Sequence, residues 1–276
     1  MKECLIVIAS YADGYLDDLL NSIKENTTDV KYEIQVVDNN PDIDELKKCV
    51  TPICIKHNIP LHLDTTITGY GDALNTGVEI NPSTSKYILY MDSDTKVAKG
   101  WLREMINCFE RHTTEHCGLV GPLVKNFENK YLPEMTNYTT IENLEGKDYR
   151  LDKSYLVGVC YLRERATLDD FKWDKNFLRA YSEDNDFTRQ VNFWDYSIFV
   201  AGKALMYHKV NSSHASMKKQ GVQPQNIGSV NYKYLLTKWH LVYKKYSDAQ
   251  FHKNKSMKKI TLGTIFEEDR LNDAIQ

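Results

Sequence analysis

The most constraining feature of the chain is an apolar run that ends in two carboxylates one residue apart. Residues 86–97 are KYILYMDSDTKV, so a short apolar strand leads directly into Asp92, Ser93 and Asp94. In open α/β sheets, ligands bind at the carboxyl ends of the strands. Two carboxylates at i and i+2 on a strand end can jointly hold a divalent cation and, through it, a diphosphate. Taken alone, the same motif also fits an ordinary polar turn.

Length and composition indicate a folded globular protein. The chain has 276 residues, 42% apolar and 26% charged, which suffices for one large α/β domain or for a domain with an appendage. The apolar run at residues 5–9 is too short for the core of a signal peptide or for a membrane span. We therefore expect a cytoplasmic protein.

The cysteine pattern agrees with a reducing compartment. The six cysteines form no CxxC pair and no His-rich ligand spacing. They are therefore predicted to be small apolar fillers or spare thiols, without a zinc site or a disulfide framework. They are Cys4, Cys49, Cys54, Cys108, Cys117 and Cys160.

Charge is distributed unevenly along the chain. The net charge is −3, yet residues 203–259 contain twelve lysines, one acidic residue and no arginine, which leaves the acidic excess to the rest of the chain. Such a basic segment fits an anionic neighbour, such as phospholipid head groups, a lipid diphosphate or nucleic acid. A solvated lysine-rich face is the equally weighted alternative.

The first hundred residues alternate between strand and helix patterns. Strands are predicted at residues 3–10, 32–37, 61–63 and 87–91, and helices at 16–23, 43–50, 69–80 and 101–109. This alternation predicts a Rossmann-like, mostly parallel central sheet with right-handed crossovers and helices on both faces.

Beyond residue 110 the pattern becomes mixed α/β. We predict strands at residues 118–124, 154–162 and 197–207, and a helix at 187–194. Residues 125–153 are polar and without clear period, as expected of a long surface loop that shapes a pocket. Residues 231–246 form an amphipathic helix that can pack on the domain, the more usual case, or lie at a membrane surface.

A second acidic cluster, Glu183, Asp184 and Asp186, precedes the helix predicted at residues 187–194. Acidic residues at a helix amino terminus often serve only to complement the helix dipole. A carboxylate held there, near a metal-bound diphosphate, would also be placed to take a proton from an acceptor hydroxyl.

At this point the chain resembles the family 2 glycosyltransferases of the GT-A fold, particularly the rhamnosyltransferase-like branch. The matching motifs follow the family's order over about residues 3–213. They are Ser10-Tyr11, Val36-Val37-Asp38-Asn39-Asn40, Gly69-x-Gly71-x-Ala73-x-Asn75-x-Gly77, Asp92-Ser93-Asp94-Thr95 with Gly100-Trp101-Leu102 behind it, Leu156-Val157-Gly158, Glu183-Asp184-x-Asp186 and His208. At residue 190, where the family usually has arginine, this chain has glutamine next to Arg189.

The resemblance implies a GT-A domain at residues 1–213, with a nucleotide-binding half (1–100) and an acceptor-binding half (101–213), and a basic, mostly helical extension at 214–276. It also implies an inverting transferase that uses a sugar nucleotide, UDP- or dTDP-linked by preference, and Mn²⁺ or Mg²⁺. By position, Asp184 would be the base, and Asp94, Asp92 and His208 would hold the metal. The donor side would be Ala9, Ser10, Tyr11, Asp38, Gly71, Asn75, Asp92 and Ser93, and the acceptor side would be supported by Glu183, Asp186, Trp173 and Tyr181.

The acceptor and the wider function leave alternatives open. The acceptor could be a glycan, a lipid-linked sugar or a modified nucleic-acid base. Residues 203–259 could also make peripheral contact with the inner face of the membrane. A nucleotidyltransferase would need a basic, glycine-rich loop after the first strand, where residues 11–15 are YADGY. A non-catalytic nucleic-acid or membrane binder on the same scaffold is the other alternative, which a metal-dependent donor-hydrolysis assay would distinguish.

Overall fold

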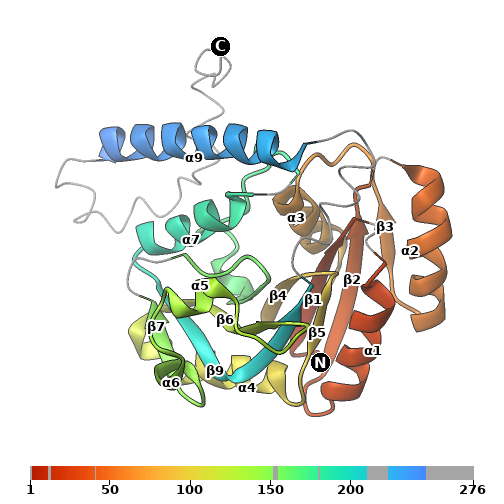
Figure 1. Ribbon diagram of the computed structural model, residues 1–276, viewed down its shortest axis with the longest axis horizontal. Helices are drawn as coiled ribbons and strands as arrows, with labels where there is room; N and C mark the ends of the chain where they lie inside the picture. The colour runs from red at the N-terminus through yellow and green to blue at the C-terminus, as the bar shows by residue number, and fades with distance from the viewer. Residues whose placement is uncertain are drawn as a thin grey trace.

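The computed structural model describes residues 2–11, 14–40, 42–151, 155–179, 181–209 and 223–246. In these residues, one central sheet is flanked by helices, and a long helix lies across the top of the molecule (Figure 1). The strands are β1 (Cys4–Ser10), β2 (Tyr32–Asp38), β3 (Leu61–Leu63), β4 (Tyr87–Asp92), β5 (Thr95–Val97), β6 (Cys117–Asn126), β7 (Asp148–Leu151), β8 (Cys160–Glu164) and β9 (Ser197–His208). The α-helices are α1 (Leu16–Asn26), α2 (Ile43–His57), α3 (Tyr70–Ile80), α4 (Trp101–Arg111), α5 (Pro133–Thr136), α6 (Ile141–Leu144), α7 (Glu183–Phe193) and α9 (Pro224–Tyr246).

The strand order of the sheet is β3-β2-β1-β4-β8-β6-β9-β5, and β7 pairs with β9. The pairings among β3, β2, β1 and β4 are parallel, as the sequence predicted, whereas β8 pairs antiparallel with both β4 and β6. The chain runs outward from β1 to β3 and then returns to the other side of β1 to form β4. This reversal is a topological switch point, where open α/β sheets bind their ligands.

Side-chain contacts show which helices cover which face of the sheet. Val7 of β1 and Tyr90 of β4 are in register and therefore point to the same face. The backbone of Gly77 in α3 rests on Val7, and Phe187 of α7 packs against Tyr90. Tyr87, three residues before Tyr90, points to the opposite face and contacts α4. Helices thus cover both faces, with α3 and α7 together on one of them.

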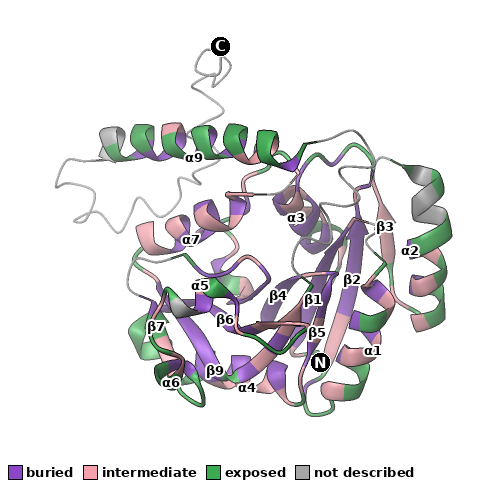
Figure 2. Cartoon of the chain, in the orientation of Figure 1, coloured by how far each residue is buried: buried purple, intermediate pink, exposed green. Residues whose placement is uncertain are grey.

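The core follows the central strands. Every residue of β1 is buried, and so are the first five residues of β4 (Figure 2). On α4, the buried positions recur at helical spacing, and Trp101 donates its indole N–H to Thr27 Oγ1 at the end of α1, at 2.8 Å. Burial on both faces explains why these strands are continuous apolar runs in the sequence.

Three predictions for the second half need correction. Residues 125–153 are not one loop, because they contain α5, α6 and β7, elements of four residues each, too short to show a period. The strand predicted at 154–162 begins only at Cys160 and continues to Glu164. The helix predicted from residue 187 begins earlier, at Glu183.

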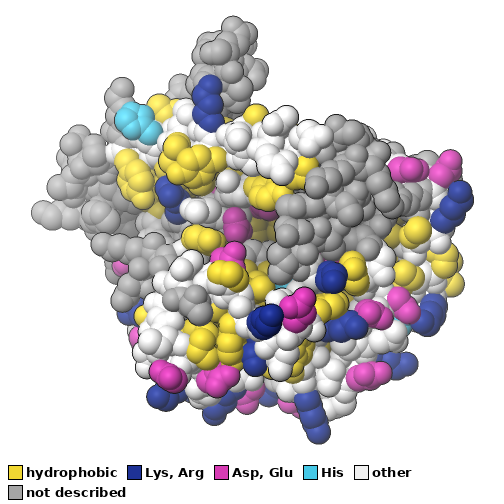
Figure 3. Space-filling view, viewed as in Figure 1, with side chains coloured by type: hydrophobic (Ala, Val, Ile, Leu, Met, Phe, Trp, Pro, Cys, Tyr) yellow, Lys and Arg dark blue, Asp and Glu magenta, His cyan; other side chains and the backbone are white. Residues whose placement is uncertain are grey.

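The basic segment 203–259 is described only at residues 203–209 and 223–246. Within α9, Lys233 is exposed but Lys238 is buried at 1% exposure, so this lysine is no part of a basic surface. Figure 3 shows apolar side chains along α9 and, below it, Lys and Arg side chains interspersed with Asp and Glu. Among the helices of the described residues, none has the length and apolar character needed to cross a bilayer.

Most of the cysteines are buried, as predicted for small apolar fillers. All six are free thiols, and five of them are buried, while Cys49 on α2 is exposed. Burial raises the pKa of Cys54 to about 11, and it raises the pKa of the Cys4 and Cys117 thiols further.

Candidate active site

The turn after β4 brings Asp92 and Asp94 next to His208. Asp92 ends β4, and the turn is closed by Thr95, whose Oγ1 donates to the Asp92 carbonyl at 2.9 Å. Thr95 is also the residue of β5 that pairs with His208, the last residue of β9. As a result, His208 Nε2 lies 3.3 Å from Asp94 Oδ1 and 3.9 Å from Asp92 Oδ2.

These three side chains have the spacing of a cation site. One ligand atom from each of Asp92, Asp94 and His208 lies within 4.8 Å of the other two. Ligands bound to one hard dication at about 2.0–2.6 Å are separated by similar distances, so the three can share one ion. Burial alone lowers the pKa of His208, but the hydrogen bond to Asp94 and the negative charges of Asp94 and Asp92 raise it overall.

Asp184 lies close to this cluster, in the first turn of α7. A Cβ built on Gly158 would lie 2.9 Å from Asp184 Oδ2, so the carboxylate packs against the bare backbone of Gly158. The next residue, Val159, accepts a hydrogen bond from the backbone N–H of Asp92 at 3.1 Å. Since Gly158 and Val159 are consecutive, Asp92 and Asp184 border the same two-residue segment.

The two neighbouring acids of α7 have different electrostatic environments. Burial raises the pKa of Asp184 to about 6; the N–H of Asn185 opposes this shift, and the charge of Glu134 adds to it. Burial, followed by the charge of Asp184, raises the pKa of Glu183 well above its usual range. Glu183 is 8% exposed, and its Oε2 has no hydrogen-bond partner in the described part of the chain. One acid can thus be ionised near neutral pH while its neighbour stays protonated.

Several predicted donor-side residues lie at the switch point. Ala9 of β1 is in register with Asp92 of β4, and Ser10 is in register with Asp38 of β2. Asp38 is buried and accepts the backbone N–H of Asn40 at 2.9 Å. Two further donor-side residues, Tyr11 and Ser93, directly follow β1 and β4. The predicted donor-side residues named in this paragraph therefore lie around the carboxyl ends of the strands.

Three other predicted residues, Gly71, Asn75 and Trp173, contact one another instead. Trp173 is 3% exposed and stacks on Phe187 with ring centroids 4.0 Å apart. A Cβ on Gly71 would lie 2.9 Å from Trp173 Cβ, and Asn75 Nδ2 donates to the Trp173 carbonyl at 2.8 Å. These contacts join α3 to Trp173, and the donor role of Gly71 and Asn75 and the acceptor role of Trp173 stay predictions.

Asp186 is held by side chains of α7 and α9. It is fully buried, and its carboxylate accepts hydrogen bonds from Gln190 Nε2 at 2.7 Å, Lys238 Nζ at 2.7 Å and Trp239 Nε1 at 2.9 Å. The carboxylate is thus hydrogen-bonded within the protein, and its support of the acceptor side stays a prediction. Tyr181, by contrast, is half-buried, with its backbone carbonyl hydrogen-bonded to Asn231 of α9.

A groove that the sequence did not reveal runs beside Asp184. Amide and hydroxyl groups line it, together with two tyrosines, one acid and one arginine; the lining residues are Glu134, Asn137, Tyr138, Tyr155, Asn185, Thr188, Arg189 and Asn192. The first three come from the region predicted to shape a pocket. Arg179, which donates a hydrogen bond to Tyr11, was also missed, because nothing in the sequence marks that pairing.

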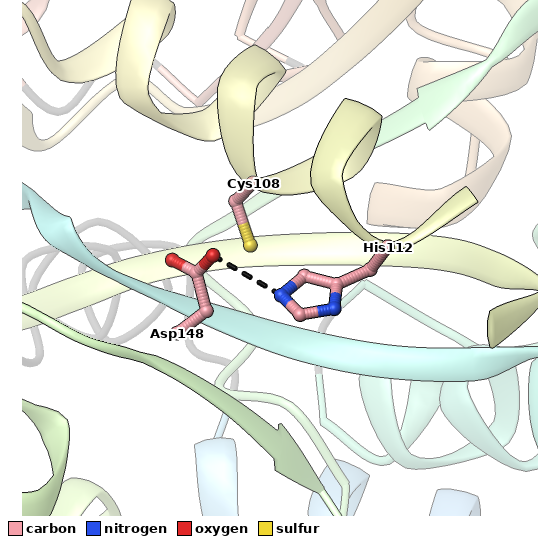
Figure 4. A group of neighbouring side chains, drawn as sticks. All are labelled: Cys108, His112 and Asp148. Atoms are coloured by element: carbon pink, nitrogen blue, oxygen red, sulfur yellow. Dashed lines mark hydrogen bonds and ion pairs between the residues drawn. The ribbon is translucent and has the colours of Figure 1, made fainter. Parts of the chain in front are cut away.

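A second cluster, formed by Cys108, His112 and Asp148, also has metal-like spacing (Figure 4). Here Asp148 already accepts two hydrogen bonds from Arg111, at 2.8 and 3.0 Å, and His112 Nε2 lies 3.1 Å from Asp148. Burial also raises the pKa of the Cys108 thiol. A carboxylate held by arginine next to a protonated thiol indicates a structural ion pair between α4 and β7 rather than a metal site.

Comparison with known families identifies the class. Residues 4–172 match the model of glycosyl transferase family 2, which is more than half of the chain, and the protein therefore belongs to that family. The match ends before α7, so the assignment of Asp184 depends on the geometry described above. No curated protein sequence is significantly similar to this chain.

Solved structures agree on the GT-A fold. S. aureus TarS (residues 1–349) is 19% identical, with a TM-score of 0.57 over 79% of this chain and 63% of that one. The same protein in complex with UDP-GlcNAc is 18% identical, with a TM-score of 0.57 over 76% of this chain and 58% of that one. GalNAc-T7 with UDP, GalNAc and Mn²⁺ is 15% identical, with a TM-score of 0.66 over 96% of this chain and 54% of that one. The chain thus spans about three fifths of the length of these TarS structures.

Proposed function

We propose that this protein is an inverting glycosyltransferase that moves a sugar from a nucleoside diphosphate to an acceptor hydroxyl by single displacement, with a divalent cation. The observation that carries the proposal is the cluster of Asp92, Asp94 and His208, together with the contacts of Asp92 and Asp184 with the consecutive residues Val159 and Gly158. Family membership supports the same activity.

The roles of the residues follow from the charge that develops during transfer. Asp92, Asp94 and His208 would hold Mn²⁺ or Mg²⁺, with the imidazole favouring Mn²⁺. When bound, the cation neutralises the charge that gathers on the leaving diphosphate. Asp184 removes the acceptor proton from the opposite side of the sugar, as a general base with a pKa of about 6 can do at neutral pH.

The donor is proposed to be a UDP- or dTDP-sugar. TarS has been crystallised with UDP-GlcNAc and GalNAc-T7 with UDP, GalNAc and Mn²⁺, and this agreement favours the uridine series. The rhamnosyltransferase-like branch remains a prediction, and so do the domain boundaries at residues 100 and 213.

The acceptor is proposed to bind in the groove beside Asp184. Amide groups and tyrosines such as Asn137, Asn185, Tyr138 and Tyr155 hydrogen-bond and stack against sugar hydroxyls and ring faces. This lining favours a glycan or a lipid-linked sugar over a nucleic-acid base. The membrane contact suggested by the basic segment remains a prediction.

The proposal is tested by screening UDP-, GDP- and dTDP-sugars for thermal stabilisation and turnover with Mn²⁺. Asp94→Ala should weaken the metal-dependent part of donor binding in calorimetry, because it removes one ligand. Asp184→Asn should bind the donor normally but lose transfer by about 10²-fold or more, as expected for loss of a general base.

The matched control is Glu128→Gln, a carboxyl-to-amide change at an exposed loop position. It should bind and turn over like the wild type. Equal metal-dependent affinities of wild type and Asp94→Ala would reject the ligand assignment, and full turnover by Asp184→Asn would remove Asp184 from the mechanism. Release of diphosphate from a nucleoside triphosphate would instead favour a nucleotidyltransferase.

A further inference from the structure

The backbone that leads into α7 has an unusual conformation. Three of its non-glycine residues have positive φ angles: Arg179 at 54°, Tyr181 at 82° and Ser182 at 69°. Such residues cost free energy, on the order of 1 kcal/mol each, and persist only where the surroundings hold them. Asp184 follows two residues after Ser182, so its position depends on whatever holds this segment, which we call the 178–182 segment.

Arg179 of this segment is held by backbone hydrogen bonds with Thr68 and Tyr70, and a side chain of α9 holds the residues on either side of it. Asn231 is 1% exposed, and its Nδ2 donates to the carbonyls of Leu178 at 2.9 Å and Tyr181 at 3.0 Å. Its Oδ1 accepts the backbone N–H of Leu178 at 3.1 Å. One amide side chain thus binds the backbone of Leu178 and of Tyr181, which lie on either side of Arg179.

A buried ion pair fixes α9 to α7 on the other side of Asp184. Lys238 Nζ lies 2.7 Å from Asp186 Oδ2 and 2.7 Å from Asp174 Oδ2. Residue 190, whose side chain also contacts Asp186, is a neutral glutamine. The positive charge facing the buried Asp186 is therefore supplied by α9. Attraction to Lys238 lowers the pKa of Asp174 despite its burial, so at least one of the two carboxylates is ionised.

An apolar contact completes the attachment of α9. A small second core contains Phe177, Tyr234, Leu235, Trp239 and Val242, with Phe193 of α7 packed against it. Phe177 and Tyr234 meet edge to face with ring centroids 4.9 Å apart. In Figure 2, α9 is buried in patches along its length and exposed elsewhere, as expected of a helix docked by one face.

We infer that α9 is a positioning element for the catalytic base, and that Asn231 and Lys238 are its positioning residues. The inference rests on the proposed role of Asp184. Asn231 fixes the segment before Asp184, and Lys238 fixes the residue two positions after it, so the carboxylate is held from both sides. Helix α9 then contributes to catalysis by positioning the base, without touching the substrate.

Asn231→Ala tests this inference directly. If α9 positions the base, the variant should stay folded and keep the KM for the donor within about twofold, while kcat falls about tenfold or more, because small displacements of a reacting group are costly. Ser229→Ala is the matched control, since Ser229 is exposed on the same helix and its hydroxyl donates to the Gln225 carbonyl within α9. The control should retain wild-type kcat. A helix that only adds stability would lower the melting temperature of Asn231→Ala and leave the kcat of the folded enzyme unchanged, which would overturn the inference.

Hydrogen exchange gives a readout that does not depend on the substrate. In Asn231→Ala, the amides of residues 181–186 should exchange faster than in the wild type, while those of β1 and β4 stay protected. Unchanged exchange in residues 181–186 would also overturn the inference. If no sugar nucleotide supports turnover by the wild type, the proposed function fails, and the exchange comparison still decides whether α9 holds this segment.

A second pair of variants examines the ion pair. Lys238→Met removes the charge but keeps the length of the side chain, and it should lower kcat in the same way if it folds. Lys238→Arg keeps the charge and should recover part of the lost kcat. Equal kcat for the folded methionine variant and the wild type would contradict a positioning role for Lys238.

Discussion

At the scale of single residues, Gly158 decides how closely the two halves of the site approach each other. Gly158→Ala would place a methyl group 2.9 Å from Asp184 Oδ2, a distance at which one of the two must move. We expect a folded variant with normal donor affinity and a kcat reduced about tenfold or more, because the base is displaced. Steady-state kinetics and calorimetry on the same preparation check this. An unchanged kcat would show that the added methyl group does not displace Asp184.

The titration of Asp184 also has a measurable consequence. Burial raises its pKa to about 6, and a general base acts in its deprotonated form. The kcat/KM of the wild type should therefore fall as the pH decreases through about 6 and reach a plateau above it. A pH profile at saturating Mn²⁺ checks this expectation. A rate that stays flat down to pH 5 would indicate a different proton acceptor.

The sequence pointed to the acidic and histidine residues that suit a metal site. It did not point to residues whose importance comes from tertiary contacts. Asp92, Asp94 and His208 lie together as expected. The first two follow the end of β4, and the pairing of β5 with β9 places His208 beside them. Asn231 and Lys238 look like ordinary residues of an amphipathic helix. Their partners lie more than fifty residues away in the chain, and no local pattern encodes such a pairing.

At the scale of elements, the contact between α4 and β7 is held by Asp148. Its carboxylate bonds Arg111 and His112, and it is 10% exposed, whereas Arg111 is 45% exposed. Asp148→Asn should destabilise the protein by about 1–2 kcal/mol, an amount limited by the solvent around Arg111. Urea unfolding at pH 7 measures the difference. Glu142→Gln, an exposed neighbour on α6, is the matched control and should leave stability unchanged.

The pH dependence of this contact has a definite sign. Burial tends to raise the pKa of Asp148, but the hydrogen bonds and charge of Arg111 lower it overall. A carboxyl whose pKa is lower in the folded state stabilises the protein above its unfolded pKa of about 3.9 and loses this contribution as the pH falls. The stability difference between wild type and Asp148→Asn should therefore shrink below about pH 4. A difference that grows on acidification would contradict the ion pair.

The region around β7 shows which elements could not be predicted from the sequence. The long strands and helices of the first half were recognised because their apolar spacing extends over several turns or a whole strand. The short elements α5, α6 and β7 have four residues each, and their arrangement depends on pairing with β9 and on contacts with α4. Such elements are determined by tertiary contacts more than by local propensity.

At the scale of the whole molecule, the site joins the two halves of one continuous sheet. Parallel strands from the first half supply Asp92, and β9 from the second half supplies His208. The inserted strand β8 connects these halves, because it pairs with β4 on one side and β6 on the other. The topology therefore explains why Asp94 and His208 lie side by side although they are 114 positions apart in the chain. The order of strands across β8 cannot be predicted from hydrophobic periodicity.

The uneven burial of the thiols has a practical consequence. Five cysteines are enclosed by the fold, and Cys49 on α2 is accessible to solvent. Maleimide or iodoacetamide dyes react with accessible thiolates, so native protein should take up one fluorophore, on a helix remote from α7 and α9. The natural chain can therefore be labelled at Cys49 without mutation, and ligand binding can be followed by fluorescence.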